Sequence, residues 1–325
     1  MILRPLLMLF AAAALAEPSA LFDGSAGIKQ VLPPLKASPI PGSRWSNAAQ
    51  AARLPARPKA EFSFAVIGDA EPGRFFWERF YSPGKDAFQR LLAASQDENP
   101  DFVFQLGDFV SKGTVENYRE HLQNIDNVRV SFFAVIGNHD RSRPNGSADK
   151  KLYEALRGKT DFYFDYGGWR FIGLDTADRR LLAPQLAWLK EALAAKGRKI
   201  IFTHVPPAYL KRLLKSEDLK SEAPPEGYIY DVLTAYFEEG SSEFEALVSN
   251  GDVARVYMGH IHAYGAATHK GVKYVLSGCG GSPLYPLPPG YPSRKMAHYI
   301  SVKVGADGSL EETVHPLNGD SFPIP

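Results

Sequence analysis

Short apolar runs rich in Val, Ile and Phe recur along the chain from residue 62 onward, separated by stretches with helical spacing. A run of four to six apolar residues followed by turn residues is typical of a buried β-strand. Six runs fit this description: Phe62–Ile67, Phe102–Leu106, Phe132–Ile136, Phe171–Leu174, Lys199–Thr203 and Val253–Met258. Between them, Asp86–Ala94 and Pro184–Ala195 have helical periodicity. Strands that alternate with helices predict an α/β core.

Other segments favour antiparallel pairing. Asp161–Tyr166 and Trp169–Leu174 flank two glycines and predict a hairpin. Near the C-terminus, Val272–Leu276, Tyr299–Val304 and Leu310–His315 follow one another as strands without a helical segment between them. We therefore expect a second, more antiparallel sheet beside the first.

The first sixteen residues predict a secretory signal peptide. Arg4 precedes an apolar run that ends in Ala14-Leu15-Ala16, which is similar to a cleavage site. The run is shorter than the ~20 residues of a membrane-spanning helix, so cleavage after Ala16 is favoured over an uncleaved anchor. We expect an exported protein, periplasmic or secreted, whose mature form has no membrane span.

The remaining chain divides into two parts. Residues 17–60 are rich in Pro, Ala and Ser without sustained periodicity, which predicts an extended arm that Trp45 could attach to the domain surface. Residues 61–325 are predicted to form one domain with an insert at about 205–250. Within the insert, the polar segment 211–240 interrupts the strand rhythm and is expected to form a flap, whose Tyr228, Tyr230 and Tyr236 could cover a substrate group or simply pack the insert down.

Composition narrows the range of partners. Among 325 residues, 37 are Lys or Arg and 36 are Asp or Glu, so the charge balance gives no argument for a nucleic-acid partner. The single cysteine, Cys279, excludes an intrachain disulfide and is expected to be buried as a small apolar side chain. A chain of this length can bury a core large enough to be stable without disulfides.

Polar side chains follow five of the predicted strands at the points where these strands end. In an open α/β sheet the carboxyl ends of the strands share one edge, and ligands bind there. Asp, Asn and His in the absence of Cys are donors that suit Mn, Fe or Zn. The residues in question are Asp69, Glu71, Asp108, Asn138, His139, Asp140, His204, His260 and His262.

In their order along the chain, these motifs resemble those of the calcineurin-like metallophosphoesterase superfamily. That family has Asp-x-His, Gly-Asp, Gly-Asn-His-Asp or Glu, a single His, and Gly-His-x-His. The corresponding segments here are Asp69-x-Glu71, Gly107-Asp108, Gly137-Asn138-His139-Asp140, His204 and Gly259-His260-Ile261-His262. The resemblance covers Phe62 to about Tyr285. It implies an α/β fold built as a two-sheet β-sandwich flanked by helices, in four αββα layers.

The resemblance also implies a dinuclear metal centre of Mn, Fe, Zn or Mg ions. The first ion would be held by Asp69, Glu71, Asp108 and His262. The second would be held by Asp108, Asn138, His204 and His260, with Asp108 bridging the two. His139 corresponds to the catalytic general acid and Asp140 to the carboxylate that orients it. The expected reaction is hydrolysis of a small-molecule phosphate mono- or diester through attack of a metal-bound hydroxide.

One position departs from the family pattern, because Glu71 stands where the motif usually has His. Glu71 could coordinate through oxygen, which would favour Mn, Fe or Mg over Zn, or it could turn away and leave the first ion with three protein ligands. Nearby, Arg74 could contact a substrate phosphate or lie on the surface. Residues 278–281 could form a glycine loop beside the site or a bare turn.

Glu71 also encourages an alternative function, that of a non-catalytic exported protein that binds metal or phosphate. The sequence leaves open the preference for mono- or diesters, the identity of the metals and the oligomeric state.

Overall fold

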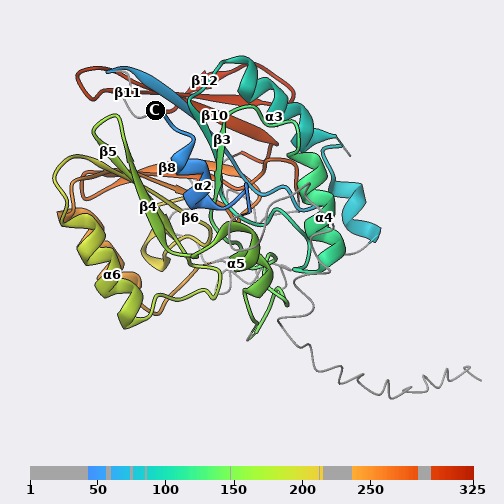
Figure 1. The fold of residues 1–325 in the computed structure, drawn as a ribbon, viewed down its shortest axis with the longest axis horizontal. Helices are drawn as coiled ribbons and strands as arrows, with labels where there is room; N and C mark the ends of the chain where they lie inside the picture. The colour runs from blue at the N-terminus through green and yellow to red at the C-terminus, as the bar shows by residue number, and fades with distance from the viewer. Residues whose placement is uncertain are drawn as a thin grey trace, which may run out of the picture.

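The computed structural model describes residues 43–55, 60–73, 76–84, 86–146, 148–211, 213–214, 236–284 and 294–325. The predicted signal peptide, Arg74 and most of the predicted flap lie outside the described residues. Two six-stranded sheets pack face to face with helices on their outer faces (Figure 1). This confirms the predicted α/β fold, a two-sheet β-sandwich flanked by helices. Among the described residues, no helix is long and apolar enough to cross a bilayer.

The first sheet has the strand order β12-β11-β10-β1-β2-β3. Strands β1, β2 and β3 are parallel, and β10 joins β1 in antiparallel register. Helices α3, α4 and α5 pack on its outer face. The bounds are β1 Phe62–Ile67, β2 Phe102–Gln105, β3 Ser131–Ala134, β10 His298–Val304, β11 Leu310–Pro316, β12 Phe322–Pro323, α3 Ala87–Asp97, α4 Val115–Asn124 and α5 Lys151–Arg157.

The second sheet has the strand order β4-β5-β6-β7-β9-β8. Its four inner strands are parallel, and β4 and β8 are antiparallel edge strands. Helices α6 and α7 cover its outer face. The bounds are β4 Phe162–Tyr166, β5 Trp169–Leu174, β6 Lys199–Thr203, β7 Val253–Met258, β8 Tyr264–His269, β9 Val272–Ser277, α6 Ala183–Leu193 and α7 Ser241–Asn250. Short 3₁₀ helices occur at η1 Phe76–Tyr81 and η2 Ala208–Leu210.

The prediction that a second, more antiparallel sheet lies beside a sheet of the core strands was wrong. All six predicted core strands are present, but three lie in the first sheet and three in the second, and each sheet has its own antiparallel strands. Helices α4, α5 and α7 were not predicted, and α7 forms the last part of the predicted insert. Periodicity identifies a strand, but the choice of its partner depends on contacts between distant parts of the chain.

Part of the predicted extended arm folds onto the first sheet. Residues Asn47–Ala52 form the helix α2, whose first turn is capped by the Ser46 hydroxyl. The side chains of Asn47 and Gln50 accept the N–H groups of Ala134 and Phe132 at 3.1 and 2.9 Å. These bonds cover the free edge of β3, which would otherwise expose unpaired backbone groups. Trp45 is buried, so its predicted attachment to the domain surface is confirmed.

The layer between the two sheets is largely aromatic. Side chains alternate along each strand, so Phe102 and Phe104 of β2 face the second sheet while Val103 faces the helices. The rings of Phe104 and Phe202 stack across the interface with their centroids 3.7 Å apart. This packing holds the two sheets, and therefore the two sets of strand ends, against each other.

We expect Phe202→Ala to lower the free energy of unfolding by about 3–5 kcal/mol, because it leaves a cavity between the sheets. Phe80→Ala is the matched control, since the Phe80 side chain is 81% exposed. Urea unfolding monitored by circular dichroism measures the free energy of unfolding of both variants. A loss below about 1 kcal/mol for Phe202→Ala would show that the interface relaxes into the cavity.

Candidate metal centre

The side chains predicted to bind metal come together at the carboxyl ends of five strands. The loops after β1, β2 and β3 approach from the first sheet, and the loops after β6 and β7 approach from the second. Three ligand atoms, one each from Asp108, His204 and His260, lie within 4.8 Å of one another. The side chains in this group are all buried: Asp69, Glu71, Asp108, Asn138, His204, His260 and His262.

Asp108 lies at the centre of the group. Its Oδ2 is 3.1 Å from Nε2 of His204, and its Oδ1 accepts the backbone N–H of His139 at 2.7 Å. The Asn138 side-chain oxygen is also 3.1 Å from Nε2 of His204. The imidazole of His260 completes this set, with its centroid 5.0 Å from that of His204. These are the four residues predicted for the second ion.

Asp69 pairs with His262. The Asp69 Oδ2 atom is 3.4 Å from Nε2 of His262, and both carboxylate oxygens of Asp69 accept the backbone N–H of His260 at 3.1 and 2.9 Å. Glu71 is 1% exposed, so its carboxylate has not turned to solvent. Its Oε2 accepts the N–H of Gly73 at 2.7 Å. Burial raises the pKa of Glu71, while the nearby charges of His139 and His262 oppose that rise.

Two of the histidines are oriented by backbone carbonyl groups. Nδ1 of His204 is 2.8 Å from the Leu106 carbonyl oxygen, and Nδ1 of His262 is 2.6 Å from that of Pro283. Because a carbonyl oxygen only accepts, each Nδ1 carries the hydrogen and each Nε2 is left facing a carboxylate. This is the usual arrangement of metal-binding imidazoles, so the residues present fit a divalent cation.

The electrostatics of the site favour positive charge. Burial raises the pKa of Asp108, but the charges of His204 and His139 outweigh burial and hold it below its usual range. Burial lowers the pKa of His204, whereas Asp108 and Asp69 raise it to a net value of about 9. His262 behaves similarly, because its hydrogen bond to Asp69 overcomes burial and raises its pKa to about 9. Buried carboxylates that draw protons onto neighbouring imidazoles also attract a metal ion, which competes with those protons.

Two positions in the site require glycine because a ligand side chain lies too close for a Cβ atom, and not because of their backbone angles. A Cβ atom on Gly137 would lie 2.1 Å from Oδ1 of Asp108, and one on Gly259 would lie 2.4 Å from Oδ1 of Asp69. Among the proposed ligands, Asp108 and His260 have positive φ values, at 43° and 71°. Strained backbone of this kind persists where the surrounding structure enforces it, typically at functional sites.

Asp140 was predicted to orient His139, but the hydrogen bonds of its carboxylate go to backbone groups and not to the imidazole. The carboxylate of Asp140 accepts backbone N–H groups of residues 109, 110 and 137, at 3.0, 3.3 and 2.7 Å. Nδ1 of His139 instead lies 3.0 Å from the carbonyl oxygen of Ser111. The Asp140 carboxylate accepts the N–H groups of two tight loops. The imidazole of His139 is oriented by the backbone carbonyl of Ser111. Asp140 therefore ties the loops after β2 and β3 together.

Arg179 is a residue near the site that the sequence analysis missed. It follows β5, and its charge lowers the pKa of His260, although burial and His204 contribute more. Its φ of 57° is unusual for arginine. A sequence signal did exist, because β5 was a predicted core strand and its carboxyl end belongs to the same edge as the metal ligands.

The loop after β9 lies beside the site. The backbone N–H of Gly280 donates to the Asp69 carbonyl at 2.8 Å, which confirms the loop rather than the bare turn. Cys279 is buried, and burial raises its pKa to about 12, as expected of an unreactive thiol. In the predicted flap, Tyr236 is buried, whereas Tyr228 and Tyr230 lie outside the described residues.

Comparison with known proteins places this arrangement in a family. Over 183 residues the chain is 23% identical to a probable cyclic nucleotide phosphodiesterase of Fibrobacter succinogenes, an alignment that covers 55% of this chain and 65% of that protein. The fold is similar to the purple acid phosphatase PPD1 of yellow lupin, with a TM-score of 0.62, 18% identity, and coverage of 83% of this chain and 54% of that one. It is also similar to a dimetal phosphatase of Danio rerio, with a TM-score of 0.54, 14% identity, and coverage of 82% and 99%.

The chain thus spans less than two thirds of the length of the phosphodiesterase and about half of the plant phosphatase. Residues 62–264, which hold every predicted metal ligand, match the calcineurin-like phosphoesterase family. This chain therefore belongs to the calcineurin-like phosphoesterase family.

Proposed function

We propose that the chain is an exported hydrolase of small-molecule phosphate mono- or diesters that depends on two metal ions. The observation that carries the proposal is the buried cluster around Asp108, in which carboxylate, amide and imidazole atoms from both sheets converge. The names of the similar proteins, a probable phosphodiesterase and two phosphatases, support the same reaction class. Export rests on the sequence of residues 1–16, and a mature protein that still begins at Met1 would contradict it.

In this proposal Asp108 is shared between two sets of ligands. Asp69, Glu71 and His262 complete the first set, and the second is completed by Asn138, His204 and His260. When bound there, the metal ions supply Lewis-acid activation of water and neutralise charge on the phosphoryl oxygens.

The side chains around the proposed ligands donate a proton, supply positive charge or join the loops. Nδ1 of His139 donates to the Ser111 carbonyl, so Nε2 is the atom left to protonate the departing oxygen of the substrate. Arg179 contributes positive charge close to His260, where a phosphate group would benefit from it. Asp140 joins the two loops that carry Asp108 and His139, through its hydrogen bonds to the N–H groups of Phe109 and Gly137.

Removing the metal ions and then adding them back tests the proposed function. We expect dialysis against a chelator to abolish hydrolysis of p-nitrophenyl phosphate or bis-p-nitrophenyl phosphate, and Mn, Fe, Zn or Mg to restore it. Metal analysis of the same samples distinguishes the alternative, since a non-catalytic binding protein would take up metal and cleave neither ester. Full activity after complete metal removal would contradict the proposed chemistry.

A further inference from the structure

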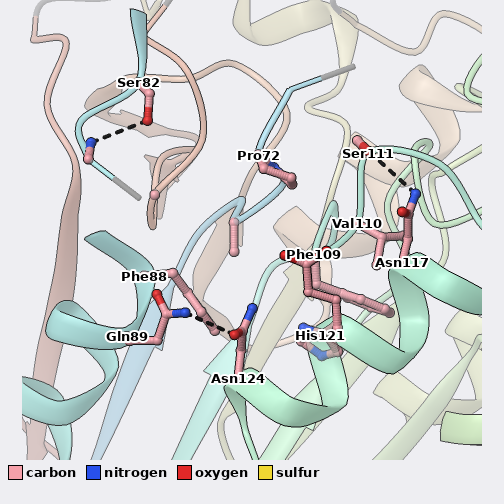
Figure 2. A pocket seen from close by; sticks show the side chains of 14 residues that line it. Pro72, Ser82, Phe88, Gln89, Phe109, Val110, Ser111, Asn117, His121 and Asn124 are labelled. Atoms are coloured by element: carbon pink, nitrogen blue, oxygen red, sulfur yellow. Dashed lines mark hydrogen bonds between the residues drawn. The ribbon is translucent and has the colours of Figure 1, made fainter. Parts of the chain in front are cut away.

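Asn138 and His139 are adjacent in the chain, but different groups orient their side chains. Nδ1 of His139 lies 3.0 Å from the carbonyl oxygen of Ser111, whose hydroxyl accepts from Nδ2 of Asn117 at 3.4 Å. Ser111 and Asn117 also line a pocket of about 540 Å³ between α3 and α4 (Figure 2). The groups that orient Asn138 come instead from residues 141–146, which follow it in the same loop.

The Asn138 amide is held in one orientation. An asparagine amide can bind a metal ion only through its oxygen, because the nitrogen is a donor. Nδ2 of Asn138 donates to the carbonyl oxygen of Pro144 at 3.3 Å, and Oδ1 lies 3.1 Å from Nε2 of His204. Because a carbonyl oxygen only accepts, the side of the amide that faces Pro144 must carry the nitrogen. The contact with Pro144 therefore directs the Asn138 oxygen toward the other proposed ligands of the second ion.

Arg141 in turn fixes the Pro144 carbonyl. Nη2 of Arg141 donates to that oxygen at 2.8 Å, and Nε donates to the backbone carbonyl of Asn138 at 3.2 Å. Nη1 donates to the carbonyl of Gly146 at 3.2 Å. One guanidinium thus holds both the backbone of Asn138 and the acceptor of its side chain. Arginine can do this because its donors form a rigid planar fork, whereas lysine has a single nitrogen.

The charge of Arg141 is buried and paired. Arg141 is 3% exposed, and its Nη1 pairs with Oδ1 of Asp178 in the loop after β5. Oδ2 of Asp178 is 2.9 Å from Nζ of Lys150, and the same Nζ is 2.5 Å from Oδ2 of Asp175. A substrate phosphate could not reach so enclosed a guanidinium. Arg141 therefore influences the site through the residues that it holds and not by contact with the substrate.

We propose that Arg141 is a positioning residue of the second metal site, which sets the amide of Asn138 through Pro144 so that the amide oxygen faces the ion. The inference rests on the proposed function, because it takes Asn138 as a ligand of the second ion. Residues that hold metal ligands in place typically contribute about 10–100-fold to metal affinity or activity. Asn138 belongs only to the second set of ligands, so the loss of Arg141 should affect one ion and not both.

Arg141→Met and Arg141→Lys test this role through Mn²⁺ binding to the metal-depleted protein, measured by isothermal titration calorimetry. We expect both variants to weaken binding at one of the two sites by about 10–100-fold and to leave the other site near its wild-type affinity. Arg141→Lys carries the test if Arg141→Met does not fold, because lysine keeps the charge beside Asp178. Arg170→Met is the matched control, since Arg170 also pairs with a carboxylate and donates to a carbonyl, but at the start of β5. It should leave both sites unchanged.

Asn138→Ala shows whether Arg141 acts through Asn138. In the Asn138→Ala background, Arg141→Lys should cause no further loss of Mn²⁺ affinity, because the amide that Arg141 orients is absent. An equal loss with and without Asn138 would show that Arg141 only supports the loops, and this would overturn the proposal. Wild-type Mn²⁺ affinity in Arg141→Lys would also overturn it, because charge alone would then be enough.

Hydrolysis of p-nitrophenyl phosphate by the same preparations separates this inference from the proposed function. If no ester is hydrolysed, but Arg141→Lys weakens Mn²⁺ binding only when Asn138 is present, the proposed function fails and the role of Arg141 stands. If the ester is hydrolysed and neither Arg141 variant changes Mn²⁺ binding, the proposed function stands and the role of Arg141 is wrong. A wild-type protein that binds no Mn²⁺ would contradict both.

Discussion

Asp108→Ala is expected to lower kcat/KM for phosphoester hydrolysis by more than about 10³-fold. Loss of a residue that only hydrogen-bonds to a metal ligand already lowers metal affinity or activity by about 10–100-fold. Asp108 is proposed to be a ligand of both ions, so its loss should cost more. Its carboxylate contacts His204 through one oxygen and the backbone of His139 through the other. Asp108→Asn, which keeps the shape of the side chain and can still accept from His139, should lose most of the activity as well. The measurements are kcat/KM with p-nitrophenyl phosphate and the number of metal ions per chain.

Asp165→Ala serves as the control for this prediction. Asp165 is an exposed carboxylate on β4 that pairs with Arg170, so its loss should change neither metal content nor rate. Full metal content together with full activity in Asp108→Asn would exclude the bridging role.

His139→Ala is expected to slow the hydrolysis of alkyl phosphates by about 10²–10⁴-fold, the usual contribution of general acid catalysis. An aryl phosphate should lose much less, because p-nitrophenolate departs without needing a proton. The imidazole of His139 is held by the Ser111 carbonyl and is not among the proposed ligands, so metal content should stay unchanged. The comparison requires kcat for glycerol 2-phosphate and for p-nitrophenyl phosphate with the same preparation.

His269→Ala is the matched histidine control, since His269 lies at the end of β8 and pairs with Glu245 of α7. It should leave both rates near those of the wild-type protein. An equal loss on alkyl and aryl substrates in His139→Ala would argue that His139 positions the site without donating a proton.

The sequence by itself determined the core strands and the residues at their ends. Apolar runs such as Phe62–Ile67 can be recognised because a strand that is buried on both faces needs continuous apolar residues. The polar residues that follow such a strand then lie at the edge of the sheet. Asp69, Asp108, Asn138, His204, His260 and His262 were predicted on this ground and converge as expected.

Only the tertiary structure decided how the strands divide between two sheets and what orients His139. The partner of a strand and the packing of α2 on β3 depend on contacts between residues far apart in the chain, which no local pattern records. The carbonyl of Ser111 is a backbone group that every residue possesses, so its role has no signature in the side chains. The pocket between α3 and α4 likewise exists only once the helices are placed against the sheet, because its lining comes from segments that the sequence separates.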